Sequence, residues 1–165
     1  RRRRKKVVRC GFHATLAADD ALQHADAVVV GEAEGVWPRV LEDLAAGTTR
    51  GRYMAEKMSD LKGLPIPRYD LVDLRRYKIP NLPAQTTRGC PYHCNWCAKP
   101  IWGQRYHVRT PDNVVAELAW LKRTYRPDHI WFVADIFGLI PGWVAQYSRL
   151  VDELDERLRV QRLEL

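Results

Sequence analysis

The sequence predicts an α/β fold, because short apolar segments typical of strands alternate along the chain with amphipathic segments typical of helices. Two strand–helix pairs precede residue 48, a proline-rich stretch follows, and the alternation resumes at residue 84. We therefore expect three regions. Residues 1–48 form the rear part of a doubly wound parallel sheet, residues 49–83 form a linker, and residues 84–165 form the first strand–helix units of a parallel barrel or open sheet.

The first region carries two strands and two helices. We expect strands at residues 5–10 and 27–31 and helices at residues 18–24 and 36–46, the second of which ends at Gly47. Two parallel strands alone are too few for a stable domain, so we interpret this region as the C-terminal half of a domain whose N-terminal half is missing. The chain also starts with arginine and has its first methionine at position 54, which indicates a piece of a longer protein.

The third region repeats the strand–helix order. We expect a strand at residues 84–87, then a cysteine-containing loop, a helix that begins at Thr110 and Pro111, a strand at residues 130–134 and a helix at residues 141–158. In parallel sheets the loops after the carboxyl ends of the strands carry the chemistry. The apolar residues expected on one face of each helix are Val114, Leu118 and Leu121 in the first, and Val144, Tyr147, Val151, Leu154 and Leu158 in the second.

The composition is that of a globular protein rather than of a disordered or membrane-spanning one. Hydrophobic residues make up 46% and charged residues 28% of the 165 residues, and no apolar run approaches the roughly 18 residues that a membrane span needs. The formal net charge is +7, but six of the 27 basic residues lie in Arg1–Lys6, and the other 21 nearly balance 20 acidic residues. This run is a localisation signal, a phosphate-binding arm or a solvated tail, and no second basic stripe favours nucleic-acid binding.

Three of the four cysteines, Cys90, Cys94 and Cys97, stand close together in the pattern CxxxCxxC. Three thiolates on one loop can ligate an iron–sulfur cube and leave its fourth iron without a protein ligand. A zinc site is the alternative, with His93 as a further ligand, although zinc usually takes two separated pairs of ligands. Disulfide pairing would leave an odd cysteine. This clustering, in a chain whose N-terminus lacks a secretory signal pattern, predicts a reducing, cytoplasmic location.

Around these cysteines the sequence resembles the radical S-adenosylmethionine superfamily. The resemblance rests on the cysteine spacing directly after a predicted strand and on the aromatic Trp96 just before the last cysteine. It implies a TIM-like barrel and a [4Fe-4S] cluster with Cys90, Cys94 and Cys97 as ligands. The remaining iron then binds the amino and carboxylate groups of S-adenosylmethionine, and Trp96 lies beside the adenine of this cofactor.

Residues 11–15, 25–34 and 102–117 further resemble the cobalamin-binding branch of that superfamily. This resemblance implies that residues 1–48 are the C-terminal part of a Rossmann-like cobalamin-binding domain. It also implies that residues 84–165 are the N-terminal part of a radical S-adenosylmethionine barrel that the chain end truncates.

The resemblance assigns a cofactor contact to two more residues. His13 is expected to touch the corrin of cobalamin, and Asp135 is expected to hydrogen-bond S-adenosylmethionine. The sequence departs from the family pattern near both of them: Cys10 replaces a glycine, and Asp135-Ile-Phe stands where many members of the superfamily have a GGE motif. The cobalt-ligating DxHxxG motif of some relatives is absent from the chain.

The activity implied by the resemblance is reductive cleavage of S-adenosylmethionine to a 5′-deoxyadenosyl radical. Cobalamin then assists either methyl transfer to a small-molecule substrate or an oxidative cyclisation, and a flavodoxin or ferredoxin acts as reductant. The alternatives are a non-catalytic iron–sulfur or cobalamin-binding remnant and a zinc-binding module. The truncated chain is expected to be inactive by itself.

Overall fold

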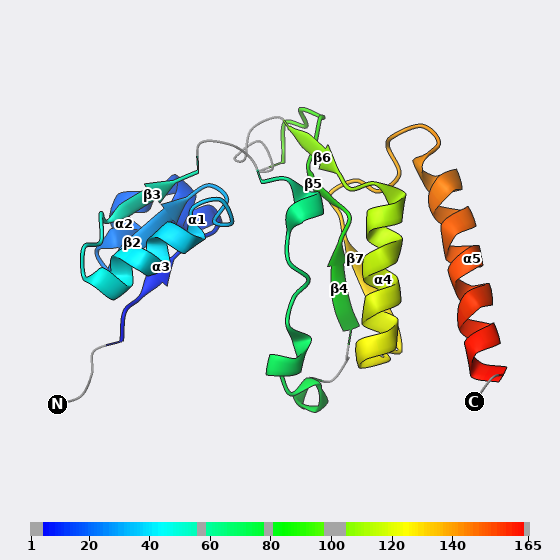
Figure 1. Ribbon diagram of the computed structural model, residues 1–165. Coiled ribbons are helices and arrows are strands. Elements are labelled where there is room, and N and C mark those ends of the chain that lie inside the picture. The colour runs from blue at the N-terminus through cyan, green and yellow to red at the C-terminus, as the bar shows by residue number, and fades with distance from the viewer. Residues whose placement is uncertain (1–4, 56–58, 78–80, 98–104, 164–165) are drawn as a thin grey trace. The chain divides into compact units, whose positions relative to one another are not determined.

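The structure is a computed structural model that describes residues 5–55, 59–77, 81–97 and 105–163. It divides into two compact units, which we call unit 1, through Asp60, and unit 2, from Leu61 onward (Figure 1). Each unit combines helices with small sheets, so the predicted α/β class is confirmed. Residues 1–4, which form most of the basic run, lie outside the described residues. So do residues 102–104, which carry part of the resemblance to the cobalamin-binding branch.

Unit 1 is built on a parallel sheet in the order β1 (Val8–Arg9), β2 (Ala27–Val30) and β3 (Arg52–Met54). The first two strands lie within the predicted ranges. The third lies in the segment 49–83 that the sequence analysis assigned to a linker. It was missed because it is three residues long and buries only Tyr53, which leaves no periodicity to detect.

The helices of unit 1 cover both faces of β2. Ala27 and Val29 pack with Val40, whereas Val28 packs with Ala14 and Ala21 on the opposite side. A strand covered on both faces reads as an unbroken apolar run, which is why β2 was recognisable in the sequence. The three helices are α1 (Phe12–Leu16), which was not predicted, α2 (Ala18–Leu22) and α3 (Trp37–Ala46).

The third helix of unit 1 ends where the sequence predicts. Gly47 follows α3 with a backbone φ of 74°, in the left-handed region that glycine adopts at little cost. The amide of Thr48 donates to the carbonyl oxygen of Asp43 at 2.9 Å and so satisfies one of the last carbonyls of the helix.

Unit 2 is centred on a parallel pair, β4 (Asn81–Gln85) and β7 (His129–Val133), covered by α4 (Pro111–Tyr125) (Figure 1). Thr110 precedes the helix with extended backbone angles and Pro111 opens it, as predicted. The predicted apolar face of α4 is confirmed, because Val114, Leu118 and Leu121 are buried against Leu82 and Ala84 of β4.

The bounds predicted for the first strand of this region, 84–87, are wrong. The parallel strand β4 starts earlier, and the presence of Pro83 within it had argued against a strand. The carbonyl oxygen of Pro83 accepts a hydrogen bond from the Tyr69 hydroxyl at 2.6 Å. Because the N–H and C=O groups of one residue point to the same side of a strand, the missing N–H of the proline faces Tyr69 rather than β7, and no ladder bond is lost.

Two further strands were not predicted as a pair. Thr87–Gly89 forms β5, and Tyr106–Val108 forms β6, which pairs with it in antiparallel orientation. The predicted strand at 84–87 therefore spans the end of one strand and the start of another. An antiparallel pair also departs from the purely parallel sheet that was expected, and the Rossmann-like and barrel architectures themselves stay predictions.

The last helix, α5 (Trp143–Leu163), packs along α4. It begins two residues later than predicted, after Gly142, which has a φ of 77°. Its predicted apolar stripe is only partly covered, since Val144 is exposed while Tyr147, Val151 and Leu154 are half-buried. The side chain of Leu158 lies outside the described residues.

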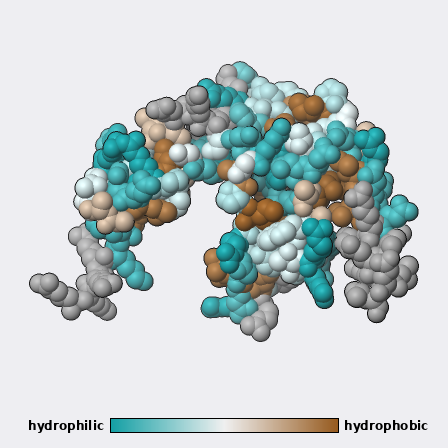
Figure 2. Space-filling view, viewed as in Figure 1, coloured by the Kyte–Doolittle hydropathy of each residue, from teal (hydrophilic) through white to brown (hydrophobic). Residues whose placement is uncertain are grey.

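The segment before β4 packs on the same core through Ile66, Tyr69 and Leu74. It contains three 3₁₀ turns, at Leu61–Gly63, Tyr69–Leu71 and Leu74–Arg76. On the face shown in Figure 2, hydrophobic side chains form separate patches within a largely hydrophilic surface. None of the helices described has both the length and the apolar character that crossing a bilayer requires.

Candidate metal centre

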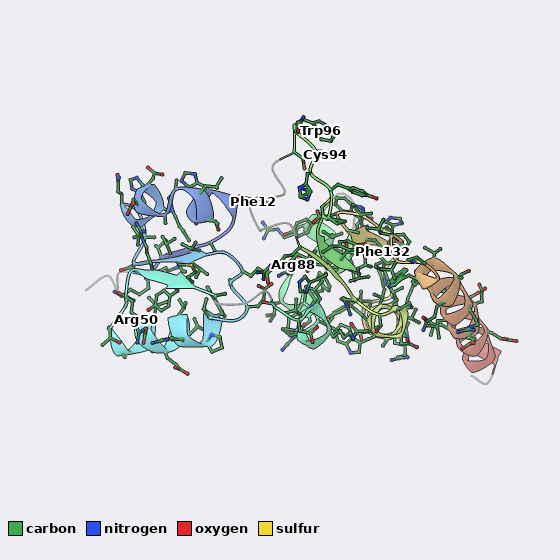
Figure 3. The ribbon with its side chains drawn as sticks, turned by 90° about the horizontal axis from the view of Figure 1, so that it is seen from above. Phe12, Arg50, Arg88, Cys94, Trp96 and Phe132 are labelled. Carbon is green, nitrogen blue, oxygen red and sulfur yellow. The ribbon has the colours of Figure 1, made fainter. Side chains whose placement is uncertain are left out.

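The three clustered cysteines lie on one loop of unit 2, which starts directly after β5 at Cys90. Cys94 is exposed, Cys90 and Cys97 are partly exposed, and all of them are free thiols. Cys94 and Trp96 project from the tip of this loop (Figure 3). We call residues 90–97 the cysteine loop. Its thiols are accessible, which a site that exchanges cofactors or substrate requires.

The donor set of the cysteine loop suits an iron–sulfur cluster. Thiolates are the usual protein ligands of such clusters, and backbone N–H groups that donate to their sulfur atoms stabilise the negative charge. One such contact is present, because the amide of Tyr92 donates to Cys90 Sγ at 3.4 Å. A turn closed by the Cys97 amide and the Cys94 carbonyl oxygen, 3.1 Å apart, shapes the rest. Within the described ranges no three histidine, cysteine or acidic side chains converge on one point, so the ligand set stays a prediction.

Gly89 gives the cysteine loop its entry geometry. Its φ is 82°, and a Cβ at this position would overlap the carbonyl oxygen of Arg105. Gly89 is also the register partner of Tyr106 in the β5–β6 pair. Glycine is therefore needed here for two independent reasons, backbone conformation and close approach of the two strands. The sequence analysis did not single this residue out, although it stands directly before the first cysteine.

Asp135 follows β7 and reaches the base of the cysteine loop. Its Oδ2 accepts a hydrogen bond from the Gly89 amide at 2.7 Å. The next residue along the chain makes a second contact, because the Tyr106 hydroxyl donates to the Ile136 carbonyl oxygen at 2.9 Å. The predicted role of Asp135 as a cofactor ligand is not tested by this geometry, which instead connects Asp135 to the backbone before Cys90.

Tyr106 carries the hydroxyl of that second contact. Burial raises the pKa of Tyr106 above its ordinary value, and the negative charge of a nearby Cys90 thiolate raises it further. Both causes favour the neutral phenol. Tyr106 is therefore a stable hydrogen-bond donor at neutral pH, and its proximity to Cys90 places it beside the first cysteine of the motif.

A buried ion pair lies next to the β5–β6 pair, where the chain leaves β6. Arg109 and Glu117 are 9% and 6% exposed and form a salt bridge. The same guanidinium donates to the Gln85 carbonyl oxygen at 2.8 Å and to Asn113 Oδ1 at 2.6 Å. The Arg109 amide donates to the Thr86 carbonyl oxygen at 3.0 Å. These bonds tie the end of β4 to the residue that follows β6.

Two buried hydroxyls lie where β4 ends and β5 begins. Thr86 and Thr87 are 0% and 2% exposed, and their Oγ1 atoms have no hydrogen-bond partner among the described residues. Buried polar atoms without a partner are uncommon in folded proteins and call for a specific explanation. Here Thr86 follows the last residue of β4, the first strand of the parallel pair, and Thr87 begins β5, which leads into the cysteine loop. Chemistry is expected after the carboxyl ends of strands in such sheets.

Comparison with known proteins identifies relatives of the chain. It is 33% identical over 131 residues to the bacteriochlorophyllide d C-8(2)-methyltransferase of Chlorobaculum tepidum, which covers 76% of this chain and 29% of the relative. It is 27% identical over 135 residues to the hopanoid C-2 methylase of Rhodopseudomonas palustris, which covers 79% of this chain and 25% of the relative. A third relative is the anaerobic magnesium-protoporphyrin IX monomethyl ester cyclase of Synechocystis, 34% identical over 61 residues, or 34% of this chain and 12% of the relative.

The chain belongs to the radical S-adenosylmethionine superfamily, in its cobalamin-binding branch. This radical S-adenosylmethionine chain spans less than a third of the length of the three relatives named above. No protein-family model matches it, and no solved structure matches it.

The remaining two predicted site residues of this radical S-adenosylmethionine chain are both exposed. Trp96 is 88% exposed at the tip of the cysteine loop, and its predicted position beside an adenine is not tested. His13 lies on α1 of unit 1, where its Nε2 is 2.8 Å from Asp20 Oδ2. Its side chain is 63% exposed, so it is accessible to a ligand, but a corrin contact stays a prediction.

Proposed function

We propose that the protein is a radical S-adenosylmethionine enzyme whose [4Fe-4S] cluster is ligated by Cys90, Cys94 and Cys97. The observation that carries this proposal is the cysteine loop itself: three accessible, free thiols on one short loop that directly follows β5. When bound, the cluster supplies the electron that cleaves S-adenosylmethionine to a 5′-deoxyadenosyl radical, and cobalamin supplies or relays the group that is transferred.

The residues around the loop have separate tasks in this proposal. The three thiolates bind the iron, and the Tyr92 amide stabilises the charge on the Cys90 sulfur. Trp96 provides an exposed aromatic surface for the adenine of S-adenosylmethionine. Asp135, which the sequence analysis assigned to this cofactor, is near enough to the base of the loop to take part in the same site.

Unit 1 is proposed to contribute to a Rossmann-like cobalamin-binding domain. Its parallel sheet, covered by helices on both faces, is the architecture expected for the end of such a domain. Gly11 and Gly31 follow β1 and β2, and both have a positive φ, 96° and 82°. These glycines leave open backbone at the carboxyl ends of the strands, and His13 lies on the same edge. The domain scheme in this proposal remains 1–48, 49–83 and 84–165.

Methyl transfer is the reaction we favour over cyclisation. The methyltransferase from Chlorobaculum tepidum is 33% identical over 131 residues, whereas the cyclase from Rubrivivax gelatinosus, which is matched over a similar stretch of 150 residues, is 25% identical. The substrate class proposed is a small molecule. The electron is proposed to come from a flavodoxin or ferredoxin, and the location is proposed to be the cytoplasm, where the four free thiols stay reduced.

Electron paramagnetic resonance of the full-length protein tests the cluster. After anaerobic reconstitution and reduction with dithionite, we expect a [4Fe-4S] signal that changes shape when S-adenosylmethionine is added, and we expect 5′-deoxyadenosine as a product. Cys94→Ala is expected to lose the signal and the product. Cys10→Ala is the matched control, because Cys10 is an exposed cysteine outside the motif.

Three results would argue against the proposal. A reduced cluster that ignores S-adenosylmethionine supports the non-catalytic remnant instead. Stoichiometric zinc with no iron supports the zinc-binding module. Equal loss of the signal in Cys10→Ala and Cys94→Ala would mean that the motif has no special role. Absorbance titration of the wild type and of His13→Ala with cobalamin tests the second cofactor separately.

A further inference from the structure

One short segment contacts both strands of the β5–β6 pair, the first of which leads into the cysteine loop. Gly89 and Tyr106 are register partners at the base of this loop, on β5 and β6. The Asp135 carboxylate accepts from the Gly89 amide at 2.7 Å, and the Ile136 carbonyl oxygen accepts from the Tyr106 hydroxyl at 2.9 Å. Two consecutive residues after β7 therefore bind two residues that face each other across the loop base.

That segment makes aromatic contacts with the elements on either side of it. Phe132 stacks on Phe137 with ring centroids 5.4 Å apart, and Trp143 stacks on Tyr147 at 5.3 Å. Phe137 also meets Trp143 edge to face at 5.1 Å. These ring contacts enclose the residues between β7 and α5 from both ends of the segment. The loop that carries Asp135 and Ile136 is thus anchored to the core of unit 2.

Glycine is required at one position of the same segment. Gly138 has a φ of 72°, and a Cβ there would lie 2.6 Å from Val144 Cγ2. The Tyr106 ring is partly buried beside the segment, and its hydroxyl donates to the Ile136 carbonyl oxygen. Two consecutive acceptors, one paired with this hydroxyl and one with the Gly89 amide, are suited to hold the β5–β6 pair in a fixed position relative to the segment.

We propose that Asp135 is a positioning residue for the cluster ligands: by accepting the Gly89 amide it fixes the backbone that enters Cys90, while the Ile136 carbonyl and Tyr106 hold the neighbouring strand β6. This inference rests on the proposed function and adds to it. The role of Asp135 is exerted through the protein backbone and does not require contact with S-adenosylmethionine. Partners that orient metal ligands in this way typically change metal affinity by roughly 10–100-fold when they are removed.

The test compares two variants of Asp135 in the full-length protein. Asp135→Ala removes the acceptor of the Gly89 amide, whereas Asp135→Asn keeps an acceptor oxygen at the same place. After anaerobic reconstitution, iron and sulfide per chain and the rate of cluster loss to a chelator are measured. We expect Asp135→Ala to lose the cluster at least about tenfold faster than the wild type, and Asp135→Asn to recover most of the difference.

Tyr106→Phe examines the contact between the segment and β6. It removes one hydrogen bond and leaves the ring in place, so its rate of cluster loss should fall between the wild type and Asp135→Ala. The matched controls are Asp128→Ala, an exposed aspartate before the amino end of β7, and Tyr77→Phe, an exposed tyrosine. Both controls should match the wild type. The midpoint of thermal unfolding is recorded for every variant, so that cluster loss is compared between proteins of equal fold stability.

Hydrogen–deuterium exchange of the metal-free protein separates this inference from the proposed function. Exchange in the peptide that contains residues 87–97 should be faster in Asp135→Ala than in the wild type, whether or not a cluster forms. If the wild type binds no iron but exchange still rises in Asp135→Ala, the proposed function fails, whereas the effect of Asp135 on the backbone before Cys90 stands. If exchange and cluster loss are the same in Asp135→Ala and the wild type, the positioning role is overturned. Equal defects in Asp135→Ala and Asp128→Ala would overturn it as well.

Discussion

Unit 1 and unit 2 are both α/β structures, but they bury different kinds of side chain. In unit 1 the buried side chains are apolar and mostly small, and they surround one strand from both faces. Unit 2 has an apolar core of comparable kind under α4 and adds a polar layer next to the cysteine loop. Among the residues that the structure describes, the polar or charged residues with a buried side chain and backbone all belong to unit 2. They are Thr86, Thr87, Arg109 and Glu117.

The difference separates two ways of specifying a structure. Apolar packing is non-directional, so it can bring strands and helices together but does not by itself fix the angle at which a loop leaves a sheet. Hydrogen bonds and buried ion pairs are directional and costly to leave incomplete. Unit 2 uses them at the base of the loop that carries the three cysteines, where direction matters most.

The largest expected effect comes from breaking the buried ion pair. Glu117→Ala leaves the Arg109 guanidinium buried without its carboxylate, and we expect a loss of roughly 3–5 kcal/mol in the free energy of unfolding. Urea denaturation followed by circular dichroism measures it. The double variant Arg109→Met/Glu117→Leu removes both charges and should be more stable than Glu117→Ala. If the double variant is the less stable of the two, the pair is not acting as an ion pair.

A matched pair of glycines gives the next largest effect. Gly89→Ala in unit 2 meets both an unfavourable φ of 82° and an overlap with the Arg105 carbonyl oxygen, whereas Gly47→Ala in unit 1 has a φ of 74° and nothing within 4 Å. We expect about 1–2 kcal/mol of destabilisation from the left-handed backbone at Gly47, and a larger loss together with failure to retain iron for Gly89→Ala.

Thermal unfolding and iron content per chain measure the two glycine variants. Gly47→Ala serves as the control, because it changes the same residue type in the same backbone region without touching the cysteine loop. The comparison between the units fails if the two variants lose the same stability and the same amount of iron.

The smallest expected effect concerns an exposed ion pair in unit 2. Hydrogen bonds from Arg68, at 2.7 and 2.5 Å, hold the pKa of Asp70 below its ordinary value, and the Tyr125 hydroxyl contributes a further bond at 3.1 Å. Because the pKa is lowered in the folded state, the stabilisation is fully present above the unfolded-state pKa of about 3.9 and declines as the pH falls below it.

The pH dependence of Asp70→Asn checks this. The variant should be slightly less stable than the wild type at pH 7, and the difference should shrink progressively below about pH 4. Asp128→Asn, an exposed aspartate elsewhere in unit 2, should show no such pH-dependent difference. A difference for Asp70→Asn that stays constant from pH 7 to pH 3 would exclude the ionised carboxylate as its cause.

The sequence predicted those parts of the fold that depend on local signals. Helix α4 was placed correctly because Thr110 and Pro111 mark its start and because its apolar residues recur at helical spacing. Strand β2 was found because it is an unbroken apolar run. The clustering of three cysteines was likewise visible as spacing alone and led to the correct superfamily.

Features that depend on contacts between distant residues could not be read from the sequence. Strands β3 and β6 are three residues long, and each exists because of its partner strand. The contact between Asp135 and Gly89 joins positions 46 residues apart, and no spacing rule links them. The Arg109–Glu117 pair was missed because an arginine before a helix and a glutamate within it are individually common on protein surfaces.

The antiparallel pairing of β5 with β6 also has a thermodynamic consequence. Bringing the ends of a flexible chain segment together costs conformational entropy, and this cost rises only slowly with the length of the segment. In this protein Gly89 and Tyr106, which flank the connection that contains the cysteine loop, are already paired by the fold itself. A metal centre that assembles on the cysteine loop therefore does not have to supply the entropy of bringing these two strands together, and more of its binding free energy is available for ordering the thiols.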